Sequence, residues 1–373
     1  MARTIIGVND AKAVKRWAGL LALDTSQKSY FNQRFMGRGA EAEVPIQILT
    51  DLESDAGEQI TYDLLAELKM APVEGEDTLE GKEESQKFYT DAIYIDQARC
   101  GVNTGGRMTR KRTLHNLRAR AIQQQSDWWA RLFDELLFIY LSGARGINDS
   151  FIVGKNFAGR AGNPLVPPDA DHRIFPQQSA GGYAGLDSFD RFQLSQIDIA
   201  CVHAETQGGG ATGIPVLQPC KIDGAEHFVC VLHPFQEHLL RHWWNTGEWL
   251  DLQKAAAGAE GRNSPIFNNS LGMYRGCILH SHNNVIRFND AGAGANLPAA
   301  RALFMGAQAG VVAFGTPGSN LRFGWHEETR DNGDKVVIST STIFGTKKNS
   351  FTTSRGRQDF GVLALDSYAE EPR

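Results

Sequence analysis

The first residues to test for chemistry are the glycines of a candidate dinucleotide loop. Gly208, Gly210 and Gly213 have the spacing G-x-G-x-x-G. A dinucleotide site needs a strand before this motif and a helix after it, because the pyrophosphate binds at the helix N-terminus. Here a helical pattern precedes the glycines and Pro215 follows them. We interpret the run as a loop between two elements.

Two histidines have the spacing of a metal-binding helix. His238 and His242 are four residues apart on a predicted helix, so their rings would share one face. The metalloprotease form of this pair has a glutamate directly after the first histidine, whereas this chain has Leu239 there. The other histidines considered as a third ligand are His227, His233, His280 and His282. We interpret all of them as surface or core-edge side chains, and we predict neither a metal nor a cofactor.

The remaining reactive side chains show no catalytic pattern. The chain has neither a G-x-S-x-G motif nor a G-x-x-x-x-G-K-[ST] phosphate loop. Its five cysteines are scattered without a C-x-x-C pair, so we expect reduced, buried thiols. Carboxylates are concentrated in one polar segment, residues 51–84, which lacks the apolar pocket that would separate their pKa values. We predict that the chain is not an enzyme; the alternative is an α/β-lobed enzyme without a recognisable motif.

Opposite charges are concentrated in two neighbouring segments. Residues 51–84 contain twelve acidic residues and two lysines, a net charge of −10, and residues 99–120 contain seven basic residues and no acidic ones. The glycines and carboxylates of residues 72–81 predict an exposed turn. The two segments can pair within one subunit, or between copies in a head-to-tail contact of the kind that builds rings and shells.

A contact between copies gives a hypothesis about single residues. Its acidic side would consist of Glu74, Glu76, Asp77, Glu80, Glu83 and Glu84. Its basic side would consist of Arg107, Arg110, Lys111 and Arg112. A different interpretation makes residues 99–120 a nucleic-acid surface that contacts phosphates. The net charge of −5 argues against a chain that coats nucleic acid over its whole surface.

A long helix must position these segments. Apolar residues at spacings of three, four and seven predict a helix over residues 113–141, which contain no proline or glycine and end before Gly143. Such a helix is roughly 43 Å long. Its second half carries Trp128, Trp129 and Phe133, and we predict that these rings anchor the helix to a sheet.

Shorter elements flank the helix. Asn332-Gly333 predicts a hairpin between strands at 323–328 and 336–344. The apolar run at 360–365 is expected to return to the sheet under the long helix. The other expected strands are 44–48, 86–97, 228–232, 277–280 and 303–305, and the other expected helices are 11–23, 27–36, 192–205, 234–244 and 248–257.

Length and hydropathy set the broad class. The 373 residues suggest two or three domains or lobes, and 42% hydrophobic residues with 39 glycines are typical of a soluble, loop-rich protein. The longest apolar run, 136–141, is far below the ~20 residues that span a bilayer. The N-terminus lacks a basic-then-apolar signal pattern. We expect a cytosolic origin and no membrane contact.

Five sequence blocks resemble one known family. They are VEGEDTLEGKEE (73–84), YIDQARCGV (94–102), GRMTRKRTLHNLRA (106–119), SDWWARLFDELLFIYLSGARG (126–146) and MYRGCILH (273–280). These blocks are similar to the major capsid protein of tailed bacteriophages, and most of all to coat proteins of short-tailed phages with a virion-carried RNA polymerase. The resemblance runs from about residue 10 to residue 365 and covers nearly the whole chain.

The resemblance implies an α+β chain with the capsid fold shared by tailed phages and herpesviruses. The parts that it implies are an N-terminal arm (1–44), an E-loop hairpin (45–98), a peripheral P domain (99–185) with the spine helix 113–141, an axial A domain (186–321) and returning P-domain strands (322–373). An E-loop that lies across a neighbouring subunit favours pairing of the charged segments between copies.

The resemblance also implies a function. The chain would be a major capsid protein that self-assembles into the hexamers and pentamers of an icosahedral phage head enclosing double-stranded DNA. The implied partners are other copies of the chain, packaged DNA in non-specific contact, and scaffolding, portal and decoration proteins. The implied location is the virion, after synthesis in the cytoplasm of a bacterial host.

Overall fold

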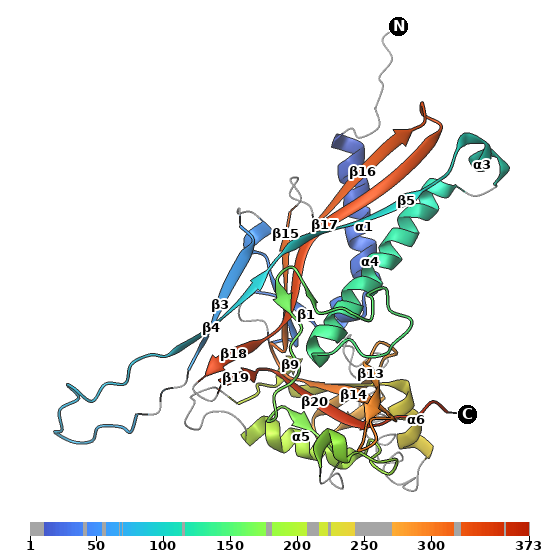
Figure 1. Ribbon diagram of the computed structural model, residues 1–373. Helices are drawn as coiled ribbons and strands as arrows, with labels where there is room; N and C mark the ends of the chain where they lie inside the picture. Colours follow the sequence, from blue (N-terminus) through green and yellow to red (C-terminus); the bar gives the residue numbers. More distant parts are fainter. Residues whose placement is uncertain are drawn as a thin grey trace.

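Two sheets and a long helix between them organise the chain (Figure 1). The computed structural model describes residues 11–39, 43–53, 57–66, 68, 70–113, 116–176, 181–206, 216–222, 225–242, 271–316, 322–353 and 356–372. The glycine run at 208–213 and the helix expected at 248–257 lie outside the described residues.

The helices and strands have the following bounds. The helices are α1 (Ala11–Lys28), α2 (Tyr30–Arg34), α3 (Arg107–Arg112), α4 (Leu117–Ser142), α5 (Leu194–Thr206) and α6 (Pro234–His242), with short 3-10 turns at Asp51–Glu53 and Gly182–Gly185. The six-stranded sheet contains β1 (Met36–Arg38), β2 (Ile46–Leu49), β5 (Asp96–Asn103), β15 (Gly310–Gly315), β16 (Phe323–Arg330) and β17 (Lys335–Lys348). The eight-stranded sheet contains β8 (Arg173–Ile174), β9 (Cys220–Ile222), β10 (Ala225–Leu232), β11 (Gly272–Tyr274), β12 (Cys277–Ser281), β13 (Arg287–Ala291), β14 (Leu297–Met305) and β20 (Val362–Tyr368). The two-stranded ribbons are β3 (Gln59–Leu65) with β4 (Phe88–Tyr94), β6 (Gly159–Arg160) with β7 (Asn163–Pro164), and β18 (Ser350–Thr353) with β19 (Gly356–Asp359).

The first sheet is built around the long strand β17. Strand β17 pairs antiparallel with β15, β16 and β5, while β2 lies parallel to both β1 and β15. Helices α1 and α4 lie side by side on this sheet (Figure 1), and α4 contributes Trp129 and Phe133 to a core that includes Phe344 of β17. The sheet and the two helices therefore form one packed unit.

The second sheet is buried on both faces. Alternate residues of β10 point to opposite faces, as in any strand. Phe228, Cys230 and Leu232 join the core that packs against α5, while Val229 and Val231 join the core shared with α4. The run FVCVL is apolar at every position because both faces need apolar side chains.

The long helix begins four residues later than the sequence pattern predicts. Helix α4 starts at Leu117, because the side-chain oxygen of Asn116 caps it by accepting a hydrogen bond from the amide of Ala119 at 3.2 Å. It ends at Ser142, one residue beyond the predicted range, and Gly143 caps it in the expected left-handed conformation at φ 67°. The basic residues 107–112 form the separate helix α3, so they do not lie on the long helix.

Other expectations differ from the structure. The helix expected at 27–36 is only the short α2, and Met36 already belongs to β1. Helix α1 continues through residues 24 and 25 to Lys28, whose ammonium pairs with Asp24 one turn earlier at 2.8 Å. The strand expected at 86–97 is two strands, because the chain changes partner from β3 to β17 at Ile95. The run at 360–365 lies in the second sheet, where β20 pairs with β14 and β8.

Other local predictions are confirmed. The hairpin of β16 and β17 turns at Asp331, Asn332 and Gly333, which all have positive φ. Strand β10 leads into α6 at Pro234, and β12 and α5 lie within two residues of the predicted ranges. Strand β14 begins at Leu297, six residues before the strand expected at 303–305. Strand β15 falls within the 186–321 range but pairs with β2 and β17 of the first sheet.

Candidate functional site: an acidic loop, a basic helix and a pocket

The acidic loop projects from the body of the protein on a two-stranded ribbon. Strands β3 and β4 pair in register from Gln59 opposite Tyr94 to Leu65 opposite Phe88, and the chain beyond them extends away from both sheets (Figure 1). The base of the ribbon is fixed to the body, because Asp91 accepts a hydrogen bond from the Tyr62 hydroxyl at 3.0 Å and pairs with Lys347 of β17. These contacts fix the orientation of the ribbon, and therefore of the acidic loop, relative to the first sheet.

The six acidic residues singled out in the sequence all lie on this loop. Glu84 accepts a hydrogen bond from the amide of Met70 at 2.7 Å, which ties the two sides of the loop together. Glu83 accepts one from the amide of Gly81 at 2.8 Å, and Asp77 pairs with Lys82 at 3.3 Å. The side chains of Glu74, Glu76 and Glu80 are exposed. The loop therefore shapes itself with three of its carboxylates and presents the others to solvent.

The basic residues singled out in the sequence lie on α3, which is held by the β16–β17 turn. The carboxylate of Asp334 accepts a hydrogen bond from the amide of Arg107 at 2.9 Å, and the Asp334 carbonyl accepts one from the guanidinium of Arg110 at 2.7 Å. The side chains of Arg107, Lys111 and Arg112 are exposed. Figure 1 shows α3 and the acidic loop at opposite ends of the folded subunit. The two charged segments are not brought together within one chain.

The three aromatic residues predicted as anchors differ in burial. Trp129 is fully buried and its indole Nε1 donates a hydrogen bond to the Thr340 hydroxyl of β17 at 2.9 Å. Phe133 is buried against Phe344, with ring centroids 4.7 Å apart. Trp128 is only half-buried and meets Trp129 edge-on at 4.8 Å between centroids.

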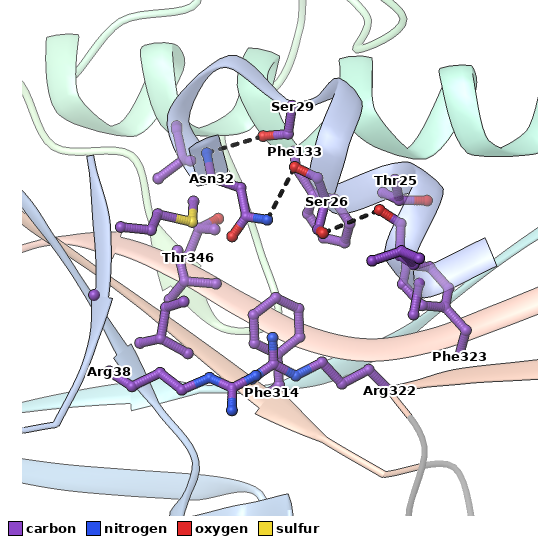
Figure 2. A pocket seen from close by; sticks show the side chains of 17 residues that line it. Thr25, Ser26, Ser29, Asn32, Arg38, Phe133, Phe314, Arg322, Phe323 and Thr346 are labelled. Carbon is purple, nitrogen blue, oxygen red and sulfur yellow. Dashed lines mark hydrogen bonds between the residues drawn. The ribbon is translucent and has the colours of Figure 1, made fainter. Parts of the chain in front are cut away.

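A pocket of about 440 Å³ lies between the N-terminal helices, α4 and the first sheet (Figure 2). Its apolar lining includes Met36, Phe133, Leu137, Phe314 and Phe323. Arg38 and Arg322 reach toward each other across one side, and Thr25, Ser26 and Asn32 line the other (Figure 2). No local pattern predicts this pocket, because its residues come from segments that are far apart in the chain.

A buried carboxylate of α4 holds the start of α2. Asp134 of α4 accepts hydrogen bonds from the Ser29 hydroxyl at 2.8 Å and from the amides of Tyr30 and Phe31 at 2.8 and 3.2 Å. These amides are the unpaired donors at the start of α2. Burial raises the pKa of Asp134 to about 6, against the opposing effect of these hydrogen bonds and of Arg34.

This pKa predicts how stability depends on pH. Between about pH 4 and pH 6 the folded chain keeps a proton on Asp134 that the unfolded chain has lost, so the free energy of unfolding should fall as pH rises through this window. The contribution is about 3 kcal/mol for a shift of about two pKa units. We expect the stability difference between wild type and Asp134→Asn, measured by urea unfolding from pH 4 to 7, to decrease by that amount. A difference that stays constant or increases would contradict the assignment.

The histidines considered as metal ligands have structural contacts. The Nδ1 atom of His233 accepts a hydrogen bond from the amide of Phe235 at 3.1 Å, and that of His282 accepts one from the amide of Asn284 at 3.1 Å. Burial lowers the pKa of both rings, to about 3 and about 4 respectively. Within the described ranges, no three His, Cys, Asp or Glu side chains are grouped so as to hold a metal ion. No helix of the described residues is long and apolar enough to cross a membrane.

Comparison with known proteins gives consistent matches over the whole chain. A family model described as phage capsid protein matches residues 5–371. The major capsid protein of Pseudomonas phage KPP25 is 24% identical over 354 residues, which cover 87% of this chain and 88% of that protein.

Solved capsid structures are similar as well. The capsid of Ralstonia phage GP4 is 46% identical in sequence, with a TM-score of 0.85 and full coverage of both chains. The capsid of cyanophage Pam1 is 19% identical, with a TM-score of 0.67 and coverage of 90% of this chain and 91% of that one. The similarity to the Pam1 capsid concerns the fold alone.

Proposed function

The chain belongs to the phage capsid protein family, and from this premise we propose how its copies join into a shell. It is a major capsid protein of an icosahedral phage head, a structural protein and not an enzyme. We propose that the acidic loop is the E-loop, and that it crosses onto an adjacent subunit to meet α3. The observation that supports this is that the loop and α3 lie at opposite ends of the folded subunit, so their opposite charges can meet only between two copies (Figure 1).

The parts of the chain take the following roles in this proposal. The first sheet with α1 and α4 is the P domain and α4 is its spine helix. The second sheet with α5 and α6 is the A domain, which faces the centre of each hexamer or pentamer. Strand β15 then belongs to the P domain and β20 to the A domain, because of the sheets in which they pair. The capsid is the location of the protein in the virion, and synthesis would take place in the host cytoplasm.

Assembly can rest on many weak contacts. Closure of a shell makes each contact cooperative with the others, so no single interface has to be strong. Scaffolding, portal and decoration proteins would act on this shell, and DNA would meet its inner surface without sequence preference. Salt should weaken the attraction between the acidic loop and the basic helix α3, because the charges on both surfaces are exposed to solvent.

Electron microscopy of the purified chain tests the proposal. Samples with and without a candidate scaffolding protein, at low and high salt, should contain closed shells or rings with six-fold and five-fold symmetry. Fewer of them should form at high salt. Monomers under every condition, including those with the scaffold, would contradict it.

Charge reversal tests the proposed contact between loop and helix. We expect Glu76→Lys with Glu80→Lys to abolish shells while the subunit keeps its thermal stability, because both side chains are exposed. Adding Lys111→Glu and Arg112→Glu in the same chain should restore shells, since the two surfaces again carry opposite charges. The readout is the fraction of protein in shells by sedimentation.

The matched control makes the same charge change elsewhere. Asp171 and Glu371 are exposed and lie outside the loop, so Asp171→Lys with Glu371→Lys should assemble like wild type. Normal shells from Glu76→Lys with Glu80→Lys would exclude these carboxylates from the contact. Failure of the four-residue variant to recover would exclude α3 as their partner.

A further inference from the structure

Two buried side chains meet where the chain passes from the first sheet to the second. Lys348 is the last residue of β17, and Asp359 lies three residues before β20. They flank the β18–β19 hairpin, whose register places Ser350 opposite Asp359, so Lys348 lies diagonally across from Asp359 on the same face. The Nζ atom of Lys348 is 2.5 Å from Oδ2 of Asp359, and the two side chains are only 3% and 2% exposed. The fold therefore holds an amine and a carboxyl group in contact and away from water.

The surroundings of this pair favour an uncharged amine and an uncharged acid over two ions. Among the described residues, the Nζ atom of Lys348 has one hydrogen-bond partner, Asp359, although an ammonium group has three donors. Burial lowers the pKa of Lys348 and raises that of Asp359, and in each case it exceeds the mutual attraction that opposes it. Both shifts favour transfer of the ammonium proton to the carboxylate. The nitrogen of Lys348 then carries a free electron pair and can act as a nucleophile.

The geometry is suited to attack on the carboxyl carbon. With an Nζ–Oδ2 distance of 2.5 Å, the nitrogen lies about 3–3.5 Å from Cγ of Asp359, the separation of reacting atoms in a near-attack arrangement. A second carboxylate lies beside the pair, since Oδ2 of Asp169 accepts a hydrogen bond from the amide of Asp359 at 2.7 Å. Burial acts to raise the pKa of Asp169, but the His172 side chain and two backbone amides outweigh it and hold that pKa below its usual value. Asp169 is therefore ionised and can accept a proton.

We propose that Lys348 and Asp359 condense into an isopeptide bond within one chain. The Lys348 nitrogen attacks Cγ of Asp359, and Asp169 accepts the proton that the nitrogen loses. Asp169 then returns this proton to the departing hydroxyl group, so the carbon–oxygen bond breaks and one water molecule leaves. No atom is oxidised or reduced, and no co-reactant is needed. The new bond joins the end of β17 to the chain just before β20, so the two sheets are covalently stapled across the β18–β19 hairpin.

A neighbouring lysine–aspartate pair lacks these features and gives an internal comparison. Lys347 pairs with Asp91, and it also donates to the carbonyl of Ala92 at 2.8 Å. Asp91 accepts further hydrogen bonds from the Tyr62 hydroxyl at 3.0 Å and from the amide of Ala92 at 2.9 Å. These contacts stabilise the charged forms, and both side chains are more exposed than those of the first pair. We expect Lys347 and Asp91 to stay an ion pair.

Mass spectrometry of the purified full-length chain tests the proposal. Relative to its own sequence, the denatured wild-type chain should lack one water molecule that Lys348→Met retains. Trypsin should release residues 348–355 joined to residues 358–373, because it no longer cleaves after the modified Lys348. Asp169→Asn keeps an acceptor for the Asp359 amide but cannot take up the proton, so its joined peptide should accumulate about 100-fold or more slowly.

The same digests contain the results that would overturn the proposal. Wild-type peptides 349–355 and 358–373 that are separate and have their sequence masses would do so. Loss of water without a joined peptide would do so too, because a succinimide ring within the chain has the same mass. Equal joining of Lys347 to Asp91 would overturn the role given to burial, and an unchanged rate in Asp169→Asn would overturn the step given to Asp169. The bond forms within one chain, so none of these results bears on the proposed contact between the E-loop and α3.

Discussion

Replacement of Trp129 by alanine should lower the free energy of unfolding by about 3–5 kcal/mol, the range for a large aromatic side chain removed from a core. The indole is fully buried between α4 and the first sheet, where it lies 5.6 Å from Phe323 and 6.0 Å from Phe133 between centroids. Its loss also leaves the Thr340 hydroxyl of β17 without its donor. Urea unfolding of the unassembled subunit measures the change.

Trp128 supplies the comparison within the same helix turn. Its ring is half-buried and packs on the edge of Trp129, so Trp128→Ala should cost clearly less, about 1–2 kcal/mol. Trp129→Phe tests the hydrogen bond separately, because it keeps most of the apolar contact and removes the donor. Equal losses for Trp128→Ala and Trp129→Ala would show that the two rings share the anchoring role.

The sequence predicted the elements whose signals are local. Asn332-Gly333 predicts a hairpin because few other residue pairs adopt two consecutive positive φ angles. Pro234 and Gly143 mark a helix start and a helix end by the same kind of local backbone chemistry. The start of α4 was predicted too early because apolar residues at helical spacing continue before Asn116. The helix itself begins only after Asn116, whose side chain caps its N-terminus.

The sequence could not predict which sheet a buried strand joins. The apolar run 360–365, whose last four residues begin β20, fits a central strand of either sheet, since both require apolar side chains. The deciding feature is Asp366, a buried carboxylate directly after the apolar residues of β20, which needs cations on neighbouring strands. Arg301 of β14 and Arg173 of β8 provide them. A buried acid in a strand was a visible signal, but its partners are 65 and 193 residues away.

The candidate contact between the acidic loop and α3 was predictable in part from the sequence. Charge segregation is a composition signal, and it pointed to the loop and to residues 107–112 without any structure. The pocket has no such signal, because it exists only after the N-terminal helices pack on α4. The exposed apolar pair at the end of the ribbon was not predicted, since only the register of β3 with β4 places Leu65 opposite Phe88.

Loss of Arg301 should strongly destabilise the second sheet. Its guanidinium donates to both carboxylate oxygens of Asp366 at 2.6 and 2.9 Å and to the carbonyl of Ser142 at the end of α4, at 2.8 Å. Burial acts to raise the pKa of Asp366, but Arg301 and Arg173 outweigh it and hold that pKa below its usual value. Arg301→Leu leaves a buried carboxylate with one partner, and we expect it to cost about 3–5 kcal/mol.

The double variant separates the ion pair from the packing. Arg301→Leu with Asp366→Leu removes both charges, so its stability should lie well above that of Arg301→Leu, because apolar replacement of a buried pair is often tolerated. Arg173 then keeps its contacts with the rings of Phe175 and Tyr183 and is partly exposed. The contribution of Asp366 is present above its unfolded pKa and is lost as pH falls through its lowered folded pKa. The stability of wild type relative to the double variant should therefore decrease below about pH 4. A double variant as unstable as Arg301→Leu would show that the cost comes from lost packing at the end of α4 and not from the unpaired charge.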